Sequence, residues 1–516
     1  MRSTFFGLET AKRGMFTSQS AIYTTGNNIS NANTPGYTRQ RIEFIQTEGF
    51  PSPAMNRPEI PGLLGTGVKE GSIERIRDQF IDRQYRNENT KLGYWQSYAG
   101  SVQKMEEIMN EPSDYGLSKA MSQFWQSLQD LSVNPENEGA RMVVLQRGQS
   151  LAETFNYLHD SLMSVRNELN HEMDVTVQQV NSLTTQLAAV NKQISEVEPH
   201  GYLPNDLYDQ RDRLLDELSS IVPIETTYQT SGGKPSTKAE GTASINLVIG
   251  NKKISLVNGS NASALSIEKD EKGVSSISVN GEIATSNTDS LTGQGKLNAL
   301  IQAYGTGEGK GLYPEMLDNL DKLAYTYASI FNEIHSKGYD KDGNGGVDAN
   351  GNPLGKNFFE GLGTDYKGAA GSIKVADLKP SEIAASLVKG NAGNGGNAIA
   401  LGNIKDLQFS NNSVTLSDGT KLENLEINNG TIQSFFEGTI GSMAVKGQQA
   451  NRLAHNSEVL LNSVDKNRQS VTAVSLDEEF SNLIQFQHAY SASARMITAI
   501  DEMLDQIING LGHVGK

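Results

Sequence analysis

The chain carries the run Asn27-Asn28-Ile29-Ser30-Asn31-Ala32-Asn33-Thr34-Pro35-Gly36-Tyr37 close to its N-terminus. This polar run and its Pro35-Gly36 pair stop helical propagation. In front of it, apolar side chains recur at multiples of a helical turn: Phe5, Leu8, Met15, Ile22 and Ile29. The spacing predicts an amphipathic N-terminal helix that ends in this run, where Pro35-Gly36 lets the chain turn away.

The opposite end of the chain shows a second periodic pattern. Its members alternate steps of three and four residues, and eight of the ten are apolar: Phe480, Leu483, Gln487, Tyr490, Ala494, Ile497, Asp501, Leu504, Ile508 and Leu511. That spacing is typical of a coiled-coil seam. Terminal segments are normally frayed and polar, so two amphipathic ends indicate that the chain uses its ends to assemble. We expect the assembly seam to comprise Leu8, Met15, Ile22, Phe480, Leu483, Tyr490, Ile497, Leu504, Ile508 and Leu511.

The strongest internal signal is a long helical rod. Between Leu151 and Val197, fourteen positions keep the three-four step and twelve of them are apolar. At about 1.5 Å per residue, such a helix is roughly 70 Å long, which suits a rod better than a compact domain. Pro199-His200-Gly201 breaks it, and a second helix over about 206–221 returns.

Two regions between the helices have a residue pattern that is not typical of helices. Hairpin signals occur at Gly250-Asn251 and Asn280-Gly281, and again at Asp418-Gly419 and Asn429-Gly430. The first region, 230–290, is predicted to be a β-rich inserted domain. The second, 340–430, is rich in Gly and Asn and is predicted to be a second insertion of β-rich or mixed character.

These patterns predict a multidomain α+β protein in which helical rods formed by both chain ends enclose two inserted domains. At 516 residues the chain exceeds what one core usually supports. The predicted division is 1–37 with 475–516 as a terminal helical coiled-coil assembly domain, 38–229 with 291–339 and 431–474 as a helical rod domain, and the two insertions.

Composition argues against several classes of function. A formal net charge of −16 offers no basic stripe for nucleic acid. The absence of cysteine excludes thiol catalysis and thiolate metal sites, and fits export in an unfolded state. Glu9, Lys12 and Arg13 interrupt the place where an apolar signal segment would lie, so we expect no cleaved signal peptide. Apolar runs are too short to span a membrane, and we expect no membrane insertion.

No catalytic, cofactor or metal site is predicted. Asp340-Lys341-Asp342-Gly343-Asn344 resembles the start of a calcium loop, but Gly351 stands where a bidentate Glu is needed, so we interpret it as a turn-rich connector. Gly305–Gly311 lacks the spacing of a phosphate loop and is interpreted as a hinge. The histidines form no close ligand pair.

Residues 28–37 resemble the signature of the axial proteins of the bacterial flagellum, the rod, hook and hook-associated proteins. The C-terminal segments Leu476–Phe480, Gln487–Tyr490 and Asp501–Leu504 are similar to the matching terminal helix of that group. Within it, Tyr37-Thr38-Arg39-Gln40, the long rod and the segment Asn205–Asp212 resemble the hook-associated proteins of the hook–filament junction.

The resemblance implies a structural protein that is exported through the flagellar type III apparatus and polymerises outside the cell at the hook–filament junction. It implies self-association in a tube or ring, contacts with the hook protein and the second hook-associated junction protein, and a cytoplasmic export chaperone on the C-terminal helix. The nearest alternative is a flagellar hook or rod protein, although a hook protein should lack the coiled-coil rod. A secreted translocator that inserts into membranes is a weaker alternative, and so is an enzyme within the 340–430 insertion.

Overall fold

The computed structural model describes residues 5–51, 55, 62–111, 113–114, 116–250, 252–285 and 293–510. The chain divides into two compact units, each assembled from segments far apart in the sequence. Unit 1 comprises Met1–Thr90, Gln179–Ala264 and Ser457–Lys516, and unit 2 comprises Lys91–Gln178 and Leu265–Asn456.

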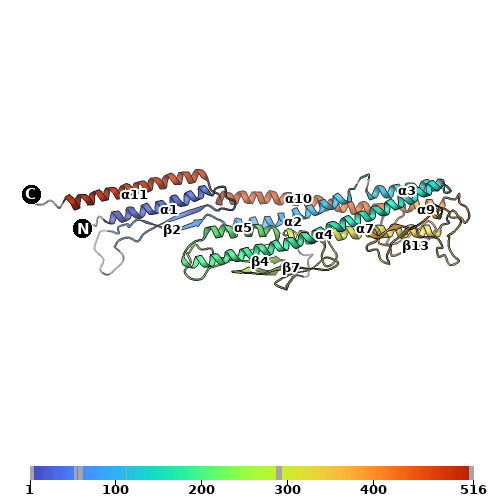
Figure 1. The fold of residues 1–516 in the computed structure, drawn as a ribbon, viewed down its shortest axis with the longest axis horizontal. Helices are drawn as coiled ribbons and strands as arrows, with labels where there is room; N and C mark the ends of the chain where they lie inside the picture. The colour runs from blue at the N-terminus through green and yellow to red at the C-terminus, as the bar shows by residue number, and fades with distance from the viewer. Residues whose placement is uncertain are drawn as a thin grey trace, which may run out of the picture. The chain divides into compact units, whose positions relative to one another are not determined.

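Helices from both ends of the chain lie side by side in unit 1 (Figure 1). They are α1 (Phe5–Ser30) and α11 (Leu476–Gly510), which run antiparallel. The other helices of unit 1 are α5 (Asn205–Ile221) and parts of α2 (Gln79–Met109), α4 (Glu138–Val197) and α10 (Ile432–Thr472). The predicted pairing of the N-terminal helix with the C-terminal helix is therefore confirmed.

A β-hairpin forms a further layer on α1. Its strands are β1 (Gln40–Gln46) and β2 (Val68–Arg75), which pair antiparallel with Gln40 opposite Arg75. Both strands lie against α1, so this helix has one neighbour in α11 and another in the hairpin.

Unit 1 also holds an antiparallel four-stranded sheet in the order β3-β4-β5-β6. Its strands are β3 (Ile224–Gln229), β4 (Thr242–Ile249), β5 (Lys252–Asn258) and β6 (Asn261–Ala262). The Asn191 amide of α4 holds its central strand, donating to the Ala243 carbonyl at 2.7 Å and accepting from the Ala243 N–H at 3.0 Å. A hairpin turn is predicted at Gly250-Asn251. Asn251 lies outside the described residues.

Unit 2 is built around aromatic side chains. Its own helices are α3 (Leu117–Val133), α6 (Lys296–Tyr304), α7 (Leu312–Lys337), α8 (Ala369–Ser372) and α9 (Gly396–Gly402). Rings from α3, α7 and the following segment pack into one fully buried cluster: Phe124, Tyr327, Phe331, Phe358 and Phe359. Gly148 of α4 is needed there, because a Cβ at this position would lie 2.6 Å from the Phe358 ring.

The predicted hairpin at Asn280-Gly281 is confirmed in unit 2. It joins β8 (Val274–Val279) to β9 (Glu282–Thr285), and both turn residues have positive φ, 51° and 80°. With β7 (Leu265–Lys269), these strands form a three-stranded antiparallel sheet.

The region 340–430 combines short strands with short helices. Its strands are two residues long: β10 (Phe359–Glu360), β11 (Lys374–Val375), β12 (Val414–Thr415) and β13 (Lys421–Leu422). The Asp418-Gly419 hairpin forms between β12 and β13, whereas Gly430 makes only an isolated bridge with Phe409. Long ladders do not form because the sequence offers Gly and Asn instead of alternating apolar residues.

Two consecutive loops after α7 have the same construction. The Asp340 carboxylate accepts the Asp342 and Asn344 N–H groups at 2.9 and 2.8 Å. Eight residues later, the Asp348 carboxylate accepts the Asn350 and Asn352 N–H groups, both at 2.8 Å. These carboxylates satisfy their own backbone turns, as the interpretation of a turn-rich connector requires.

The long predicted rod is a single helix, α4, of 60 residues, or about 90 Å. It ends at Val197 as predicted but begins at Glu138, thirteen residues before Leu151. The Asn137 side chain caps this earlier start by accepting the Gly139 N–H at 2.8 Å. The second helix, α5, matches its predicted range closely. The α+β fold class is confirmed, while the division into four domains stays a prediction.

Candidate assembly interface

Small side chains on α1 bring it close to α11. An ideal Cβ on Gly7 would lie 3.2 Å from Ile500 Cδ1, and one on Gly14 would lie 3.1 Å from Ser493 Oγ. The buried residues of α1 are all small or polar: Ala11, Thr17, Ser18, Ala21, Thr24, Thr25 and Asn28. The separation of packed helices depends on the side chains at the contact, so this composition permits a close approach.

The predicted apolar seam of α1 flanks this contact instead of forming its centre. Leu8, Met15 and Ile22 are only half-buried, and so is Ile29. The residues that meet α11 lie one position earlier in each heptad, as Gly7 and Gly14 show. Hydrophobic periodicity missed this face because it gives no weight to glycine.

The seam residues of α11 fall into two groups. Leu483, Tyr490, Ile497 and Leu504 are half-buried, while Phe480 and Ile508 are 49% and 71% exposed. Leu511 lies outside the described residues. The neighbouring Phe486 meets Phe44 of β1 edge-on, with ring centroids 5.9 Å apart.

Much apolar surface of this helix pair stays uncovered within one chain. On α1, Phe5, Phe16 and Tyr23 are 63%, 49% and 79% exposed. On α11, Met496 and Met503 are 59% and 52% exposed. Exposed apolar side chains concentrated on one substructure mark an interaction surface.

The signature run forms a compact turn after α1. The Asn31 side chain accepts from the Thr34 hydroxyl at 3.1 Å, and Gly36 has φ +80°, a conformation that favours glycine. Ala32 is half-buried, whereas Asn33, Thr34, Pro35 and Gly36 are exposed. The turn therefore leaves these four residues exposed at the surface of unit 1.

Asn28 is the buried anchor of this turn. Its amide donates to the Gln40 carbonyl at 2.8 Å and to Glu479 Oε2 at 3.1 Å. Its oxygen accepts from the Gln40 N–H at 3.0 Å and from the Tyr37 hydroxyl at 2.8 Å. Burial raises the pKa of the Tyr37 phenol, and the nearby Asp209 carboxylate raises it further, so Tyr37 stays a donor. Every hydrogen-bonding position of the Asn28 amide is satisfied.

Arg39 ties the turn to the first residues of α11. Its Nε lies 2.7 Å from Glu479 Oε1, and its Nη1 lies 2.6 Å from Glu478 Oε2. The Glu479 side chain is only 3% exposed, in a helix whose other charged residues are exposed. From sequence alone, these two carboxylates are explained only by their place at a helix N-terminus, which gives no indication of a partner 440 residues away.

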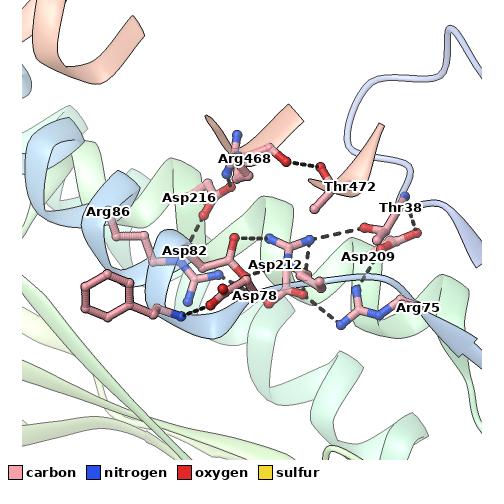
Figure 2. A network of polar contacts seen from close by, with 12 residues as sticks. Thr38, Arg75, Asp78, Asp82, Arg86, Asp209, Asp212, Asp216, Arg468 and Thr472 are labelled. Atoms are coloured by element: carbon pink, nitrogen blue, oxygen red, sulfur yellow. Dashed lines mark hydrogen bonds and ion pairs between the residues drawn. The ribbon is translucent and has the colours of Figure 1, made fainter. Parts of the chain in front are cut away.

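A second polar cluster surrounds Asp212 of α5 (Figure 2). The Asp212 carboxylate lies within 4 Å of four guanidinium groups: Arg75 at 3.0 Å, Arg86 at 3.2 Å, Arg77 at 3.4 Å and Arg211 at 3.8 Å. Burial alone would raise the pKa of Asp212, but these four cations outweigh it and hold the pKa far below its usual range. Asp212 is therefore a permanent buried anion that joins β2, α2 and α5.

The cluster extends toward the turn and toward α10 (Figure 2). Asp209 accepts the Thr38 N–H at 3.1 Å and pairs with Arg75 at 2.6 Å. Asp216 pairs with Arg468 of α10 at 2.6 Å, and Arg468 also lies over a tyrosine ring of α2. The segment Asn205–Asp212, singled out by its resemblance, thus supplies the centre of an ion network that sequence patterns did not predict.

Neither cluster is arranged as a metal site. Within the described ranges, no group of three His, Cys, Asp or Glu side chains is placed to hold a metal ion. Among those same residues, every helix is too short or too polar to span a membrane.

Three family models match the chain. The model described as "Flagellar hook-associated protein FlgK helical domain" matches residues 102–359. "Flagella basal body rod protein" matches residues 8–38, and "Flagellar basal body rod FlgEFG protein C-terminal" matches residues 467–510. The two shorter matches fall on α1 with its turn and on α11.

Curated relatives cover the chain from end to end. It is 45% identical to flagellar hook-associated protein 1 of Bacillus subtilis, over 100% of both chains. It is 27% identical to flagellar hook-associated protein 1 of Salmonella typhimurium, over 97% of this chain and 98% of the relative. Among solved structures, the hook junction protein FlgK of Burkholderia pseudomallei is similar in fold, with a TM-score of 0.58 and 16% identity over 75% of this chain and 100% of that one.

Proposed function

Because this chain belongs to the family of flagellar hook-associated protein 1, a structural component of the bacterial flagellum, we propose that it polymerises at the junction between hook and filament and adapts one to the other. In this proposal α1 and α11 are the assembly elements, and unit 2 stays folded whether or not assembly has occurred.

One observation carries the proposal: the apolar side chains that α1 and α11 leave uncovered. Phe16 and Tyr23 on one helix and Met496 and Met503 on the other need further apolar partners. Neighbouring copies of the same helix pair supply such partners in a tube or ring. The seam residues Leu483, Tyr490, Ile497 and Leu504, half-buried in one chain, become fully buried there.

The proposal includes partners and a route. The assembled copies contact the hook protein on one side and the second hook-associated junction protein on the other. The chain leaves the cytoplasm through the flagellar type III apparatus without a cleaved signal peptide, and an export chaperone covers the apolar side of α11 beforehand. A purely structural role, without enzymatic activity or cofactor, is part of the same proposal.

Gene deletion with immunolocalisation tests this function. Cells that lack the chain should carry complete hooks and shed filament subunits into the medium, and antibodies should label a narrow band between hook and filament. Loss of the hooks themselves would favour the alternative of a hook or rod protein. Label along the whole hook would contradict a junction role.

A further inference from the structure

The packing of α1 on α11 does not by itself select one alignment of the two helices. The close contacts of α1 recur every seven residues, at Gly7 and Gly14, and Ala21 continues the series. Those of α11 recur at the same interval, at Ser493 and Ile500. A shift of one helix by seven residues again places small side chains opposite α11, so most of the contact survives.

One polar cluster occurs only once along the helix pair and so departs from this seven-residue repeat. The polar clasp consists of Asn28, Arg39 and Glu479, in which the Glu479 carboxylate accepts Arg39 Nε at 2.7 Å and the Asn28 amide at 3.1 Å. Arg39 is fixed independently, because its backbone N–H donates to the Thr472 carbonyl of α10 at 3.0 Å. A seven-residue shift of α1 in either direction carries Asn28 away from Glu479, whereas Arg39 stays held at Thr472, beside the start of α11.

We propose that the polar clasp specifies the register of α1 against α11. Buried polar groups that select one alignment of otherwise repetitive helices are the best-attested use of such interactions. In a shifted pair, the buried Asn28 amide loses an acceptor that no apolar neighbour replaces. The proposal concerns pairing within one chain and does not depend on assembly at the junction.

Glu478 provides a matched control. It precedes Glu479 on the same helix turn and also contacts Arg39, at 2.6 Å. Its side chain is 61% exposed, and the carboxylate that accepts from the Asn28 amide is that of Glu479. Register selection should therefore depend on Glu479 and not on Glu478.

Disulfide trapping in the full chain reads the register directly, since the natural sequence has no cysteine. Gly14→Cys with Ser493→Cys reports the observed alignment, because the ideal Gly14 Cβ lies 3.1 Å from Ser493 Oγ. Ala21→Cys with Ser493→Cys reports a shift of seven residues. With the clasp intact, the first pair should oxidise efficiently and the second should give only a trace of intramolecular disulfide.

Adding Glu479→Leu should reduce the first disulfide and raise the second to a comparable yield, whereas Glu478→Leu should leave both unchanged. Glu479→Gln keeps one acceptor oxygen but replaces the other by an NH2 group, so it retains only one of the two hydrogen bonds and should give less of the first disulfide than the intact clasp but more than Glu479→Leu. The proposal is overturned if Glu479→Leu retains only the first disulfide. It is also overturned if Glu479→Leu and Glu479→Gln both abolish the two disulfides, because the clasp would then hold the helices together without choosing their register.

Discussion

At the scale of single residues, unit 1 contains a cluster of buried charges that pair with one another. Asp212 illustrates the principle, because its carboxylate is surrounded by guanidinium groups from β2, α2 and α5. Desolvation makes a buried ion pair expensive to form, and removing one partner leaves the others uncompensated. Each such residue therefore affects stability much more than a surface ion pair does.

Replacing Asp212 by Asn should lower the free energy of unfolding by about 3–5 kcal/mol, the range typical of a broken buried ion pair. Urea denaturation of the full chain, followed by the signal of unit 1, measures this loss. The control is Glu225→Gln, which breaks a pair with Lys253 that is 2.6 Å long and half exposed, and should cost about 0–1 kcal/mol. Equal, small losses for the two variants would contradict the role assigned to Asp212.

His335 makes the stability of unit 2 depend on pH. Its Nε2 accepts the Ala384 N–H at 3.1 Å, and its Nδ1 donates to the Lys356 carbonyl at 2.8 Å, so the ring must be neutral. Burial lowers its pKa from 6.5 to about 4. As pH falls from 6.5 toward 4, the unfolded chain takes up a proton that the folded chain does not bind, so the stability of unit 2 decreases.

We expect His335→Gln, which keeps a donor and an acceptor but does not titrate, to flatten the loss of stability between pH 6.5 and 4. Thermal unfolding of unit 2 at closely spaced pH values measures the slope. The exposed His171, also in unit 2, is the matched position, and His171→Gln should leave the slope unchanged. An unaltered slope in the His335 variant would assign the acid sensitivity to other groups.

At the scale of elements, the sequence predicts what depends on apolar spacing and misses what depends on glycine or on distant charge. The regular spacing of apolar residues and the positions of helix-breaking residues located α4, α5 and α11, because apolar side chains mark the buried faces of these helices. They did not show that Gly7 and Gly14 form the α1 contact, since glycine contributes nothing to a hydrophobic pattern. Nor did they show the Arg39–Glu479 pair, whose members are 440 residues apart in the sequence.

Leu483→Asp combined with Ile497→Asp should abolish assembly, because both half-buried side chains would place charge against apolar neighbours at several kcal/mol each. Motility and electron microscopy of complemented cells measure the effect. Glu502→Asp, on an exposed position of the same helix, is the conservative control and should support normal filaments. Normal filaments with the double variant would remove α11 from the proposed interface.

At the scale of the whole molecule, burial is distributed unevenly. Within the described part of α11, only Glu479 and Ile500 are buried, whereas α7 buries most of its length in unit 2. Local opening requires least free energy where few apolar contacts are lost. The terminal helices should therefore be the least stable elements of the free chain, and their folding should be completed by assembly.

Amide hydrogen exchange on a dilute, verified monomer should show residues 1–35 and 476–516 exchanging much faster than the rest of the chain, because the helix pair opens most easily there. The backbone around Tyr327 and Phe331 should stay protected, because these side chains lie in the aromatic core of unit 2. Exchange in assembled flagella should slow at both termini. Strong protection of the termini in the monomer would show that the helix pair is already stable without neighbours.

The two loops that follow α7 constitute a duplicated module. The bridge between Tyr339 and Gly345 recurs eight residues later between Val347 and Pro353, and the Asp340 loop recurs in the same way at Asp348. The first copy also pairs with a later segment, because Tyr339 and Ser386 exchange backbone hydrogen bonds and the Lys341 N–H donates to the Ser381 carbonyl, whereas the backbone hydrogen bonds of the second copy stay between Gly346 and Leu354. The second copy is therefore the place after α7 where the chain could lose or gain eight residues with the least effect on the hydrogen bonds of the rest of unit 2.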